Sequence, residues 1–404
     1  MRLAWLNPDG RRLLLTRLLR AFGYGYLAVA LGLYLQQLGL GSFQVGLVLA
    51  AAVAGSTLMN VLWSLVADRF GRRRTVATLA VLMMAGGLVF AFADSLWLLL
   101  LGAATGTISA SSSEVGPFVT VEQAILPETA PDDRRTGLFA LYDTFATVAG
   151  AAGALFTGVV GFFARVGLTG ASAYRPLFVL YAGIGALNLL VFLGLSDAVE
   201  LARVEGARRF LGLHRSSGTV ARLSALFGLD ALAGGFVLQP IVAYWFHLRW
   251  GLSPGALGAL FFWTGVLSGL SLLAAGWMAG RIGLLNTMVL THLPSNVLLA
   301  LVPLAPFSWL AVLLFLARMS ISQMDVPTRR SYTMAVVDPD ERTATAGITN
   351  VARTAASAVS PVLSGAAIGV GALGLPFLLA GGLKVIYDGL VYATFRNVRP
   401  PEER

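Results

Sequence analysis

The chain has 404 residues, of which 57% are hydrophobic and only 12% are charged, and its formal net charge is +9. Soluble domains carry about 25% charged residues, so this composition excludes an ordinary water-soluble protein. Cysteine is absent, which excludes disulfides and thiolate metal sites, and the three histidines lack the spacing of a metal site. We expect a polytopic membrane protein in contact with the lipid bilayer, without a cofactor or a nucleic-acid partner.

Apolar runs of about 20 residues are long enough to cross a bilayer as helices, and such runs follow one another along the chain. Residues 1–12 are short and polar, so no cleavable signal peptide is expected. The pattern predicts an all-α membrane protein with twelve transmembrane helices. These helices cover residues 13–37, 44–66, 75–93, 96–126, 136–163, 174–195, 219–247, 255–279, 284–303, 307–332, 344–369 and 374–394.

The basic residues predict the orientation. If the N-terminus is cytoplasmic, the outer loops contain only Arg165, Arg175 and Arg249. The positive-inside rule therefore predicts both termini in the cytoplasm. Arginine almost completely replaces lysine, which points to a GC-rich genome, and no N-x-[ST] sequon is present. Together these features favour a bacterial inner membrane.

The largest polar segment, residues 196–218, divides the twelve spans into six and six. We expect a solvated cytoplasmic linker here, with an interfacial amphipathic helix at its start as the alternative. The predicted domains are an N-terminal six-helix bundle over 1–195 and a C-terminal six-helix bundle over 219–404.

Weak internal matches link the two halves. "LGLGSFQVG" (38–46) matches "WGLSPGALG" (250–258), and "SLVADRFG" (64–71) matches "GWMAGRIG" (276–283), both at an offset of 212 residues. A nearly constant offset indicates a duplicated six-helix unit. We therefore expect two pseudo-symmetric bundles, which in transporters place the substrate between the halves near the membrane midplane.

The loop between the second and third spans reads "SLVADRFGRR" (64–73). It resembles the G-x-x-x-D-R-x-G-R-R pattern of the major facilitator superfamily, with Ser64 in place of the leading glycine. Together with the twelve spans and the duplication, the resemblance covers essentially the whole chain and implies a monomeric transporter that works by alternating access.

The resemblance implies a cytoplasmic latch between the halves, formed by the residues of this loop. Gly71 permits a tight turn, and Asp68 could pair with an arginine or face a helix N-terminus. The alternative is that the arginines only mark the cytoplasmic side. Asp143 and Arg353, at similar depths in the two halves, are expected to form a second inner gate. The candidate gating residues are Asp68, Arg69, Gly71, Arg72, Asp143 and Arg353.

The family fold lines its cavity with the first, fourth, seventh and tenth helices, and all four carry ionisable groups here. On the first helix, Arg17, Arg20 and Tyr24 share one face. A guanidinium such as that of Arg20 suits recognition of a carboxylate or phosphate. Alternatively, Arg20 pairs with an acid and Arg17 reaches the membrane interface.

On the fourth helix, Glu114 falls near mid-membrane, and Gly116-Pro117 is expected to kink the helix just after it. A buried carboxylate beside a helix break is a plausible proton carrier. Glu122 lies lower and either takes part in transport or pairs with a basic residue.

On the seventh helix, Asp230 is expected to carry a proton, to pair with Arg20 across the cavity, or to form an inert charge pair. Gln239, directly before a proline, suits substrate hydrogen bonding. On the tenth helix, Arg318 and Asp325 lie at membrane depth, and Arg329 lies one turn after Asp325.

Lys384 and Asp388 occupy one face of the last helix, which is peripheral in this fold, and are expected to satisfy each other. The three histidines receive no role. The candidate substrate-binding residues are Arg20, Tyr24, Glu114, Gln239, Arg318 and Asp325, and the candidate proton-coupling residues are Glu114, Asp230 and Asp325.

No P-loop pattern is present, and no clustered catalytic constellation suggests an enzyme. We therefore expect a secondary transporter that couples a small-molecule substrate to protons. An aromatic cavity suits export of a drug-like amphiphile, whereas intramembrane arginines suit a small organic anion. A receptor or scaffold without transport is the remaining alternative. The residues that favour the amphiphile are Tyr24, Tyr26, Phe236 and Trp245; those that favour the anion are Arg20, Arg318 and Arg353.

Overall fold

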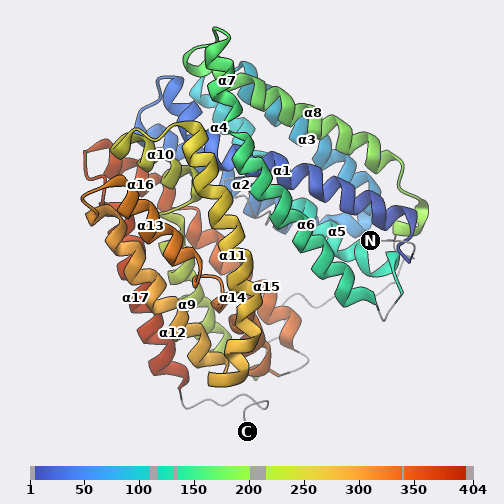
Figure 1. Cartoon of the computed structure of the whole chain (residues 1–404). Helices are drawn as coiled ribbons and strands as arrows, with labels where there is room; N and C mark the ends of the chain where they lie inside the picture. The colour runs from blue at the N-terminus through green and yellow to red at the C-terminus, as the bar shows by residue number, and fades with distance from the viewer. Residues whose placement is uncertain (1–4, 110–115, 132–133, 201–214, 339–340, 397–404) are drawn as a thin grey trace. The chain divides into compact units, whose positions relative to one another are not determined.

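The computed structural model describes residues 5–109, 116–131, 134–200, 215–338 and 341–396. Within these residues all regular structure is helical (Figure 1). The helices group into two compact units, which are treated separately below. Unit 1 contains Met1–Glu205 and Gln239–Phe262, and unit 2 contains Gly206–Leu238 and Trp263–Arg404.

Unit 1 is built from long helices and shorter ones that interrupt the predicted spans. Its helices are α1 (Pro8–Gln37), α2 (Ser42–Phe70), α3 (Arg72–Phe92), α4 (Leu96–Ala104), α5 (Pro117–Ile125), α6 (Arg135–Phe156), α7 (Val159–Arg165), α8 (Arg175–Leu193), α10 (Gln239–Trp250) and the first part of α11 (Pro254–Ile282). Short 3-10 helices lie at Leu126–Thr129, Gly170–Ala173 and Asp197–Val199.

Unit 2 contains the remaining part of α11. Its other helices are α9 (Ser217–Gly235), α12 (Leu284–Leu301), α13 (Ser308–Met319), α14 (Asp325–Ala335), α15 (Arg342–Ser357), α16 (Ser360–Gly369) and α17 (Leu375–Phe395), with a short 3-10 helix at Val302–Leu304.

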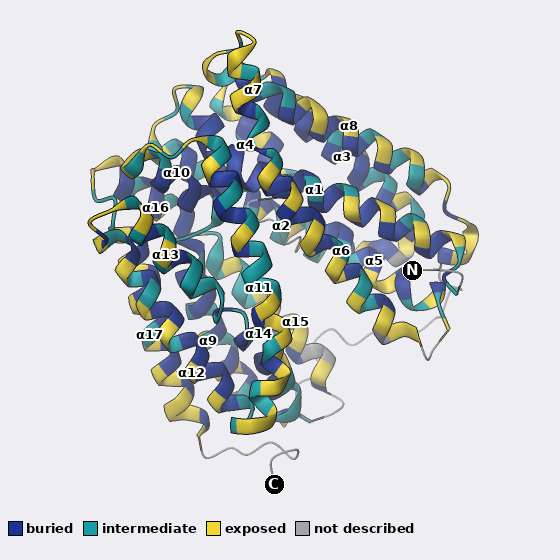
Figure 2. Cartoon of the chain, in the orientation of Figure 1, coloured by how far each residue is buried: buried dark blue, intermediate teal, exposed yellow. Residues whose placement is uncertain are grey.

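Ten helical segments of the described chain are long and apolar enough to cross a membrane. The other two predicted spans, 96–126 and 307–332, are interrupted, and each contributes shorter helices. Each of the twelve predicted apolar segments thus contains at least one described helix, and the all-α membrane fold is confirmed. Large apolar side chains such as Trp97 and Leu273 are exposed, at 75% and 81% (Figure 2), as expected for helix faces that meet lipid.

The prediction of one continuous helix over 307–332 is wrong. Helix α13 ends at Met319, a turn occupies 320–324, and α14 begins at Asp325. Pro327 lacks an N–H and cannot continue the ladder of a longer helix through this turn. Within the turn, the Gln323 backbone N–H donates instead to the Ser271 hydroxyl of α11, at 3.2 Å.

Glycine lets helices of unit 1 approach at backbone distance. A Cβ atom on Gly153 of α6 would lie only 2.0 Å from the Phe22 carbonyl oxygen of α1. A Cβ on Gly32 of α1 would similarly lie 2.6 Å from the Pro240 carbonyl oxygen of α10. This second contact places α10 beside α1, so part of the predicted C-terminal domain 219–404 packs within unit 1. The proposed domain boundaries themselves remain predictions.

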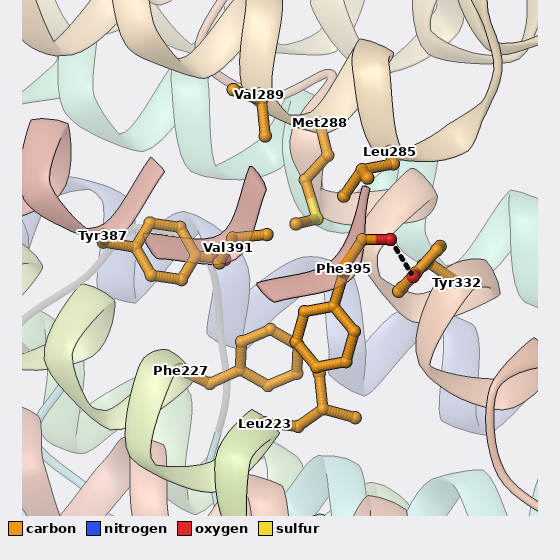
Figure 3. Close-up of a cluster of buried hydrophobic side chains, with 9 residues drawn as sticks. All are labelled: Leu223, Phe227, Leu285, Met288, Val289, Tyr332, Tyr387, Val391 and Phe395. Carbon is orange, nitrogen blue, oxygen red and sulfur yellow. Dashed lines mark hydrogen bonds between the residues drawn. The ribbon is translucent and has the colours of Figure 1, made fainter. Parts of the chain in front are cut away.

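An apolar cluster forms a core of unit 2 on the same helices that carry its charged network (Figure 3). Phe227 lies one turn before Asp230 on α9, and Met288 lies one turn before His292 on α12. Charged groups deeper in the unit are therefore held on helices whose neighbouring turns are already packed. The cluster comprises Leu223, Phe227, Leu285, Met288, Val289, Tyr332, Tyr387, Val391 and Phe395.

Candidate functional site: two buried ion-pair clusters

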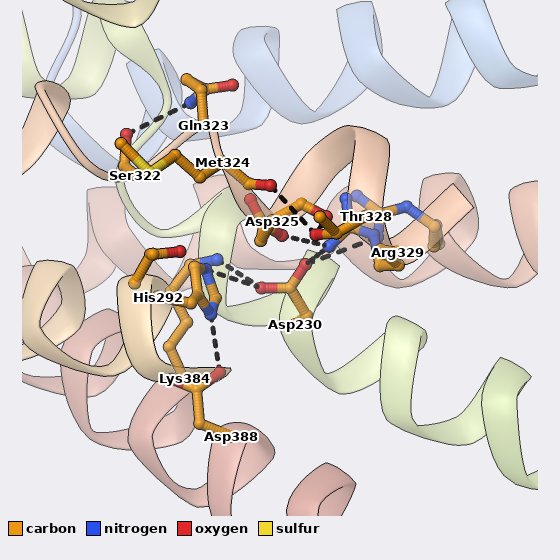
Figure 4. Close-up of polar contacts among 12 residues, drawn as sticks. Asp230, His292, Ser322, Gln323, Met324, Asp325, Thr328, Arg329, Lys384 and Asp388 are labelled. Carbon is orange, nitrogen blue, oxygen red and sulfur yellow. Dashed lines mark hydrogen bonds and ion pairs between the residues drawn. The ribbon is translucent and has the colours of Figure 1, made fainter. Parts of the chain in front are cut away.

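Asp230 on α9 is the centre of a charge network in unit 2, and only 4% of the residue is exposed (Figure 4). Lys384 of α17 donates to its Oδ1 atom. Arg329 of α14 and Arg353 of α15 both reach its Oδ2 atom, at 3.0 and 3.4 Å. One carboxylate therefore joins three cations from three different helices.

The Asp325–Arg329 pair connects the broken tenth span to this centre. Asp325 is the first residue of α14, and its Oδ2 atom lies 2.9 Å from the Arg329 guanidinium one turn later. Because Arg329 also contacts Asp230, it bridges two carboxylates (Figure 4). The pair expected from the sequence is present, and it belongs to a larger network.

The expected pairing of Lys384 with Asp388 is wrong. Lys384 pairs with Asp230, and Asp388 pairs with His292 of α12 at 2.7 Å (Figure 4). Among the described ion pairs none joins Lys384 to Asp388. The helix face that carries them is turned into unit 2. There Lys384 meets Asp230 of α9, and Asp388 meets His292 of α12.

His292 belongs to this network, although no role for it is predicted from the sequence. It is 4% exposed, and its two ring nitrogens face two different carboxylates. Asn296, one turn later on α12, donates to the second oxygen of Asp388 at 2.9 Å. The spacing of His292 and Asn296 in the sequence places them one helical turn apart. The sequence does not show that both contact Asp388 of α17.

Arg318 has a different environment at the end of α13. Its Nη1 contacts the Met319 sulfur at 3.1 Å, its guanidinium carbon lies 5.9 Å from the centre of the Phe315 ring, and its buried Nε atom has no hydrogen-bond partner. It makes no ion pair with a carboxylate of the described chain. Among the described residues, Arg318 is therefore the cation of this set that forms no ion pair with a carboxylate.

The charges of the unit 2 network do not balance. Counted over the described residues, this set holds four cationic side chains and three carboxylates, so one positive charge is in surplus if His292 is neutral. An uncompensated charge at membrane depth is costly, and an anion would offset it. The cations are Arg318, Arg329, Arg353 and Lys384, and the carboxylates are Asp230, Asp325 and Asp388.

Unit 1 contains a smaller cluster around Arg20 and Glu122, both 0% exposed. The Arg20 guanidinium lies 2.6 Å from Glu122 Oε2, and the Tyr142 hydroxyl donates to the same oxygen at 2.5 Å. Thr16 donates to the other oxygen at 3.2 Å, and Phe118 lies under the guanidinium at 4.3 Å. The alternative in which Arg20 pairs with an acid is the one realised, and Glu122 is that acid.

The residues of the expected inner gate each have a partner within their own unit. Asp143 lies 3.9 Å from Arg17, whose guanidinium sits over the Tyr142 ring at 4.5 Å. Arg353 pairs with Asp230. A contact between Asp143 and Arg353 remains a prediction.

The other expected binding residues lie in unit 1 or outside the described residues. Tyr24 is 2% exposed, and its ring packs on Tyr181 at 6.0 Å. Gln239 is the first residue of α10 and is half-buried. Glu114 lies outside the described residues, although α5 begins at Pro117 as the Gly116-Pro117 signal predicts.

Glu200, which lies in the predicted linker 196–218, holds the loop between α2 and α3. Gly71 adopts a φ of +102°, which favours glycine. The Glu200 carboxylate accepts the backbone N–H groups of Arg72 and Arg73, at 2.8 and 3.1 Å, and so caps α3. Arg72 also pairs with Glu128 at 3.2 Å.

Two of the expected latch residues remain undefined by these contacts. Arg69 is exposed, and the side chain of Asp68 lies outside the described residues. The contacts of Gly71 and Arg72 explain how the loop is held within unit 1. A latch between the two halves remains a prediction.

Comparison with known proteins agrees with the fold. The family model "Major Facilitator Superfamily" matches residues 13–248. An "Uncharacterized membrane protein" of Saccharomyces cerevisiae is 27% identical over 413 residues, covering 94% of this chain and 92% of that protein.

Two solved structures share the fold at low identity. The nucleoside transporter NupG has a TM-score of 0.76 at 14% identity, covering 96% of this chain and 100% of that one. A D-xylose–proton symporter has a TM-score of 0.72 at 16% identity, covering 95% and 97%. The chain belongs to the Major Facilitator Superfamily.

Proposed function

We propose that the chain is a proton-coupled secondary transporter that carries a small organic anion, such as a carboxylate or phosphate ester, by alternating access. The observation that carries this proposal is the surplus cation of the unit 2 network. A bound anion beside Arg318 would supply the missing negative charge, and a planar guanidinium suits a carboxylate or phosphate.

Proton coupling is supported by the setting of the carboxylates. Asp230 and Asp325 are buried and joined through Arg329, so a change of charge at one group alters the partners of the others. The structural neighbour named a D-xylose–proton symporter offers a precedent for proton coupling on this fold. Asp230, Asp325 and Glu114 remain candidate proton carriers. We further propose cytoplasmic termini and a bacterial inner membrane.

Unit 1 gives little support to export of a drug-like amphiphile. Such a substrate would require aromatic side chains that line a cavity. Tyr24 instead packs on Tyr181, and Tyr26 packs on Phe22 and Phe156 at 5.6 and 5.9 Å. These rings stabilise the interior of unit 1, so the argument for the anion is the stronger one.

The direct test is uptake into proteoliposomes with and without an imposed pH gradient. The probes are radiolabelled lactate, malate, glucose 6-phosphate and inorganic phosphate, with glucose as an uncharged control and ethidium as a cationic amphiphile. We expect uptake of at least one anion, increased by the gradient and absent for glucose. Gradient-driven ethidium movement without anion uptake would support the amphiphile alternative. Anion uptake that ignores the gradient would contradict proton coupling.

A further inference from the structure

We infer that His292, held between Asp388 and Asp230, is the side chain that takes up the coupling proton. The inference rests on the proposed function and deepens it by naming the proton site. His292 thereby joins the carboxylates that are predicted from the sequence as proton carriers. Asp388 and Asn296 position the His292 ring.

The geometry fixes the ring between two acids. Nδ1 lies 2.7 Å from Asp388 Oδ1, and Nε2 lies 3.9 Å from Asp230 Oδ1. Asn296 holds the other oxygen of Asp388 at 2.9 Å. Tyr387 meets the imidazole edge to face, with the ring centres 5.9 Å apart. These contacts come from α9, α12 and α17, so the ring is oriented by three helices.

The proton balance follows from these contacts. When Asp388 is ionised, Nδ1 carries a hydrogen and donates it to Asp388, so Nε2 keeps a lone pair directed toward Asp230. A proton taken up at Nε2 makes an imidazolium with an N–H group facing each carboxylate. No covalent bond other than the new N–H bond changes. The Asn296 Nδ2 group, 3.0 Å from Nδ1, then donates its hydrogen to the other Asp388 oxygen, Oδ2.

His292 fits this role better than the central carboxylate does. A proton on Asp230 would remove the counter-charge that Lys384, Arg329 and Arg353 share. A proton on His292 leaves every carboxylate of the network charged. Histidine is also the side chain that ordinarily changes charge between about pH 5 and 8.

Protonation at His292 would reach the anion site through Asp230. His292 and Lys384 both face Asp230 Oδ1, so an imidazolium would compete with the lysine for one oxygen. The other charged groups around this centre are Arg329 and Asp325 of α14, Arg353 of α15 and Arg318 of α13. An added positive charge raises the surplus of the network and so favours anion binding. By reciprocity, a bound anion favours proton uptake, which is symport.

The other histidines lack this arrangement in the part of the chain that is described. His247 of α10 contacts the Leu252 carbonyl oxygen at 2.9 Å and has no carboxylate partner. His214 lies outside the described residues. His247→Gln is therefore the matched control for His292→Gln.

The first experiment needs no substrate. With only three histidines in the chain, ¹⁵N-imidazole NMR of the full-length protein is tractable, and His292→Gln identifies the resonance. We expect the His292 ring signal to report the gain of a proton as the pH is lowered across the range in which the protein stays folded, and Asp388→Asn to alter that response. A ring that keeps one protonation state across the range would overturn the inference.

The second experiment separates this inference from the proposed function. For each anion that wild-type proteoliposomes take up, gradient-driven accumulation is compared with exchange at equal pH. His292→Gln should lose the gradient-driven part and keep exchange, while His247→Gln behaves as wild type. Gradient-driven accumulation by a folded His292→Gln protein at the wild-type level would overturn the inference alone. Absence of anion uptake by the wild type would overturn the proposed function, whereas the NMR titration still tests the histidine.

Because His292→Gln could impair folding, Asp388→Asn gives an independent arm. This variant retains His292 but removes the charge that holds Nδ1. We expect the pH dependence of accumulation to move while exchange at equal pH persists. An unchanged pH profile in Asp388→Asn would contradict the role of Asp388 as a positioning residue.

Discussion

The two buried clusters differ in how their charges are shared. In unit 1, Arg20 and Glu122 form a fully buried pair of opposite charge, and two hydroxyls donate to the Glu122 carboxylate. In unit 2, Asp230 pairs with three cations, His292 faces two acids, and Arg318 forms no ion pair with a carboxylate of the described residues. A balanced pair suits a structural role, whereas a shared and unbalanced network can change partners when a proton or an anion arrives.

The largest effect is expected for Asp230→Asn, because it leaves three cations without their common counter-charge. Removing one partner of a buried ion pair costs about 3–5 kcal/mol, so both the unfolding temperature and transport should fall steeply. Asp94→Asn is the control, since Asp94 pairs with Arg175 at 2.6 Å and its side chain is 67% exposed. Thermal unfolding in detergent and anion uptake measure both. Wild-type stability and uptake in Asp230→Asn would show that the network has no central acid.

Glu122→Gln should be almost as destabilising, but for stability alone. It removes the carboxylate charge that lies 2.6 Å from the buried Arg20 guanidinium, at a cost of about 3 kcal/mol. Replacing both residues, as in Arg20→Met with Glu122→Met, should recover much of the loss. Gradient dependence of uptake, measured below the unfolding temperature, should be unchanged. A folded Glu122→Gln protein that exchanges anions but ignores the gradient would place proton coupling in unit 1 instead.

Arg318→Gln should weaken anion binding with little effect on stability, because within the described residues the guanidinium forms no ion pair with a carboxylate. A charge-assisted hydrogen bond contributes about 1.5–3 kcal/mol, so the dissociation constant of the transported anion should rise about tenfold to a hundredfold. Arg222→Gln, at an exposed position on α9, is the matched control. Equal affinities in Arg318→Gln and the wild type, measured by thermal shift or calorimetry, would remove Arg318 from the site.

The smallest effect is expected for Glu200→Gln, which weakens the cap of α3 at Arg72 and Arg73. Loss of a helix cap costs about 1 kcal/mol, so the unfolding temperature should fall slightly. Asp197→Asn is the control, because the Asp197 side chain is 98% exposed and lies 3.6 Å from Arg73. Equal stability of the two variants would indicate that Glu200 does not fix the loop.

Much of the fold followed from composition and periodicity. The apolar runs predicted the helices, and Gly116-Pro117 marked the start of α5. The break before Asp325 was missed because the run over 307–332 reads as continuous, although Pro327 was a signal for it. Local sequence indicates whether a helix can form. It indicates less clearly where a helix is interrupted, because the backbone groups freed there find partners on a neighbouring helix.

The sequence singled out most of the buried charged residues, but it predicted few of their partners; whether these residues bind substrate stays a prediction. Arg318, Asp230 and Asp325 were identified because a charge at membrane depth is rare. Their partners depend on which helix faces neighbour each other, so Lys384 was assigned to Asp388 when it pairs with Asp230. His292 and Glu200 were missed because a lone histidine and a loop acid carry no sequence signal until a second segment meets them.

The most direct test of the central claim follows protons and anion together. Wild-type proteoliposomes containing a trapped pH dye receive lactate, malate, glucose 6-phosphate or phosphate outside, at equal pH and with the membrane potential clamped. We expect at least one of these anions to enter and to acidify the lumen by more than the protons that the anion itself releases. In His292→Gln we expect this acidification to be lost while anion exchange persists. Entry of the anion into wild-type liposomes without that acidification, or no entry of any anion, would contradict the central claim.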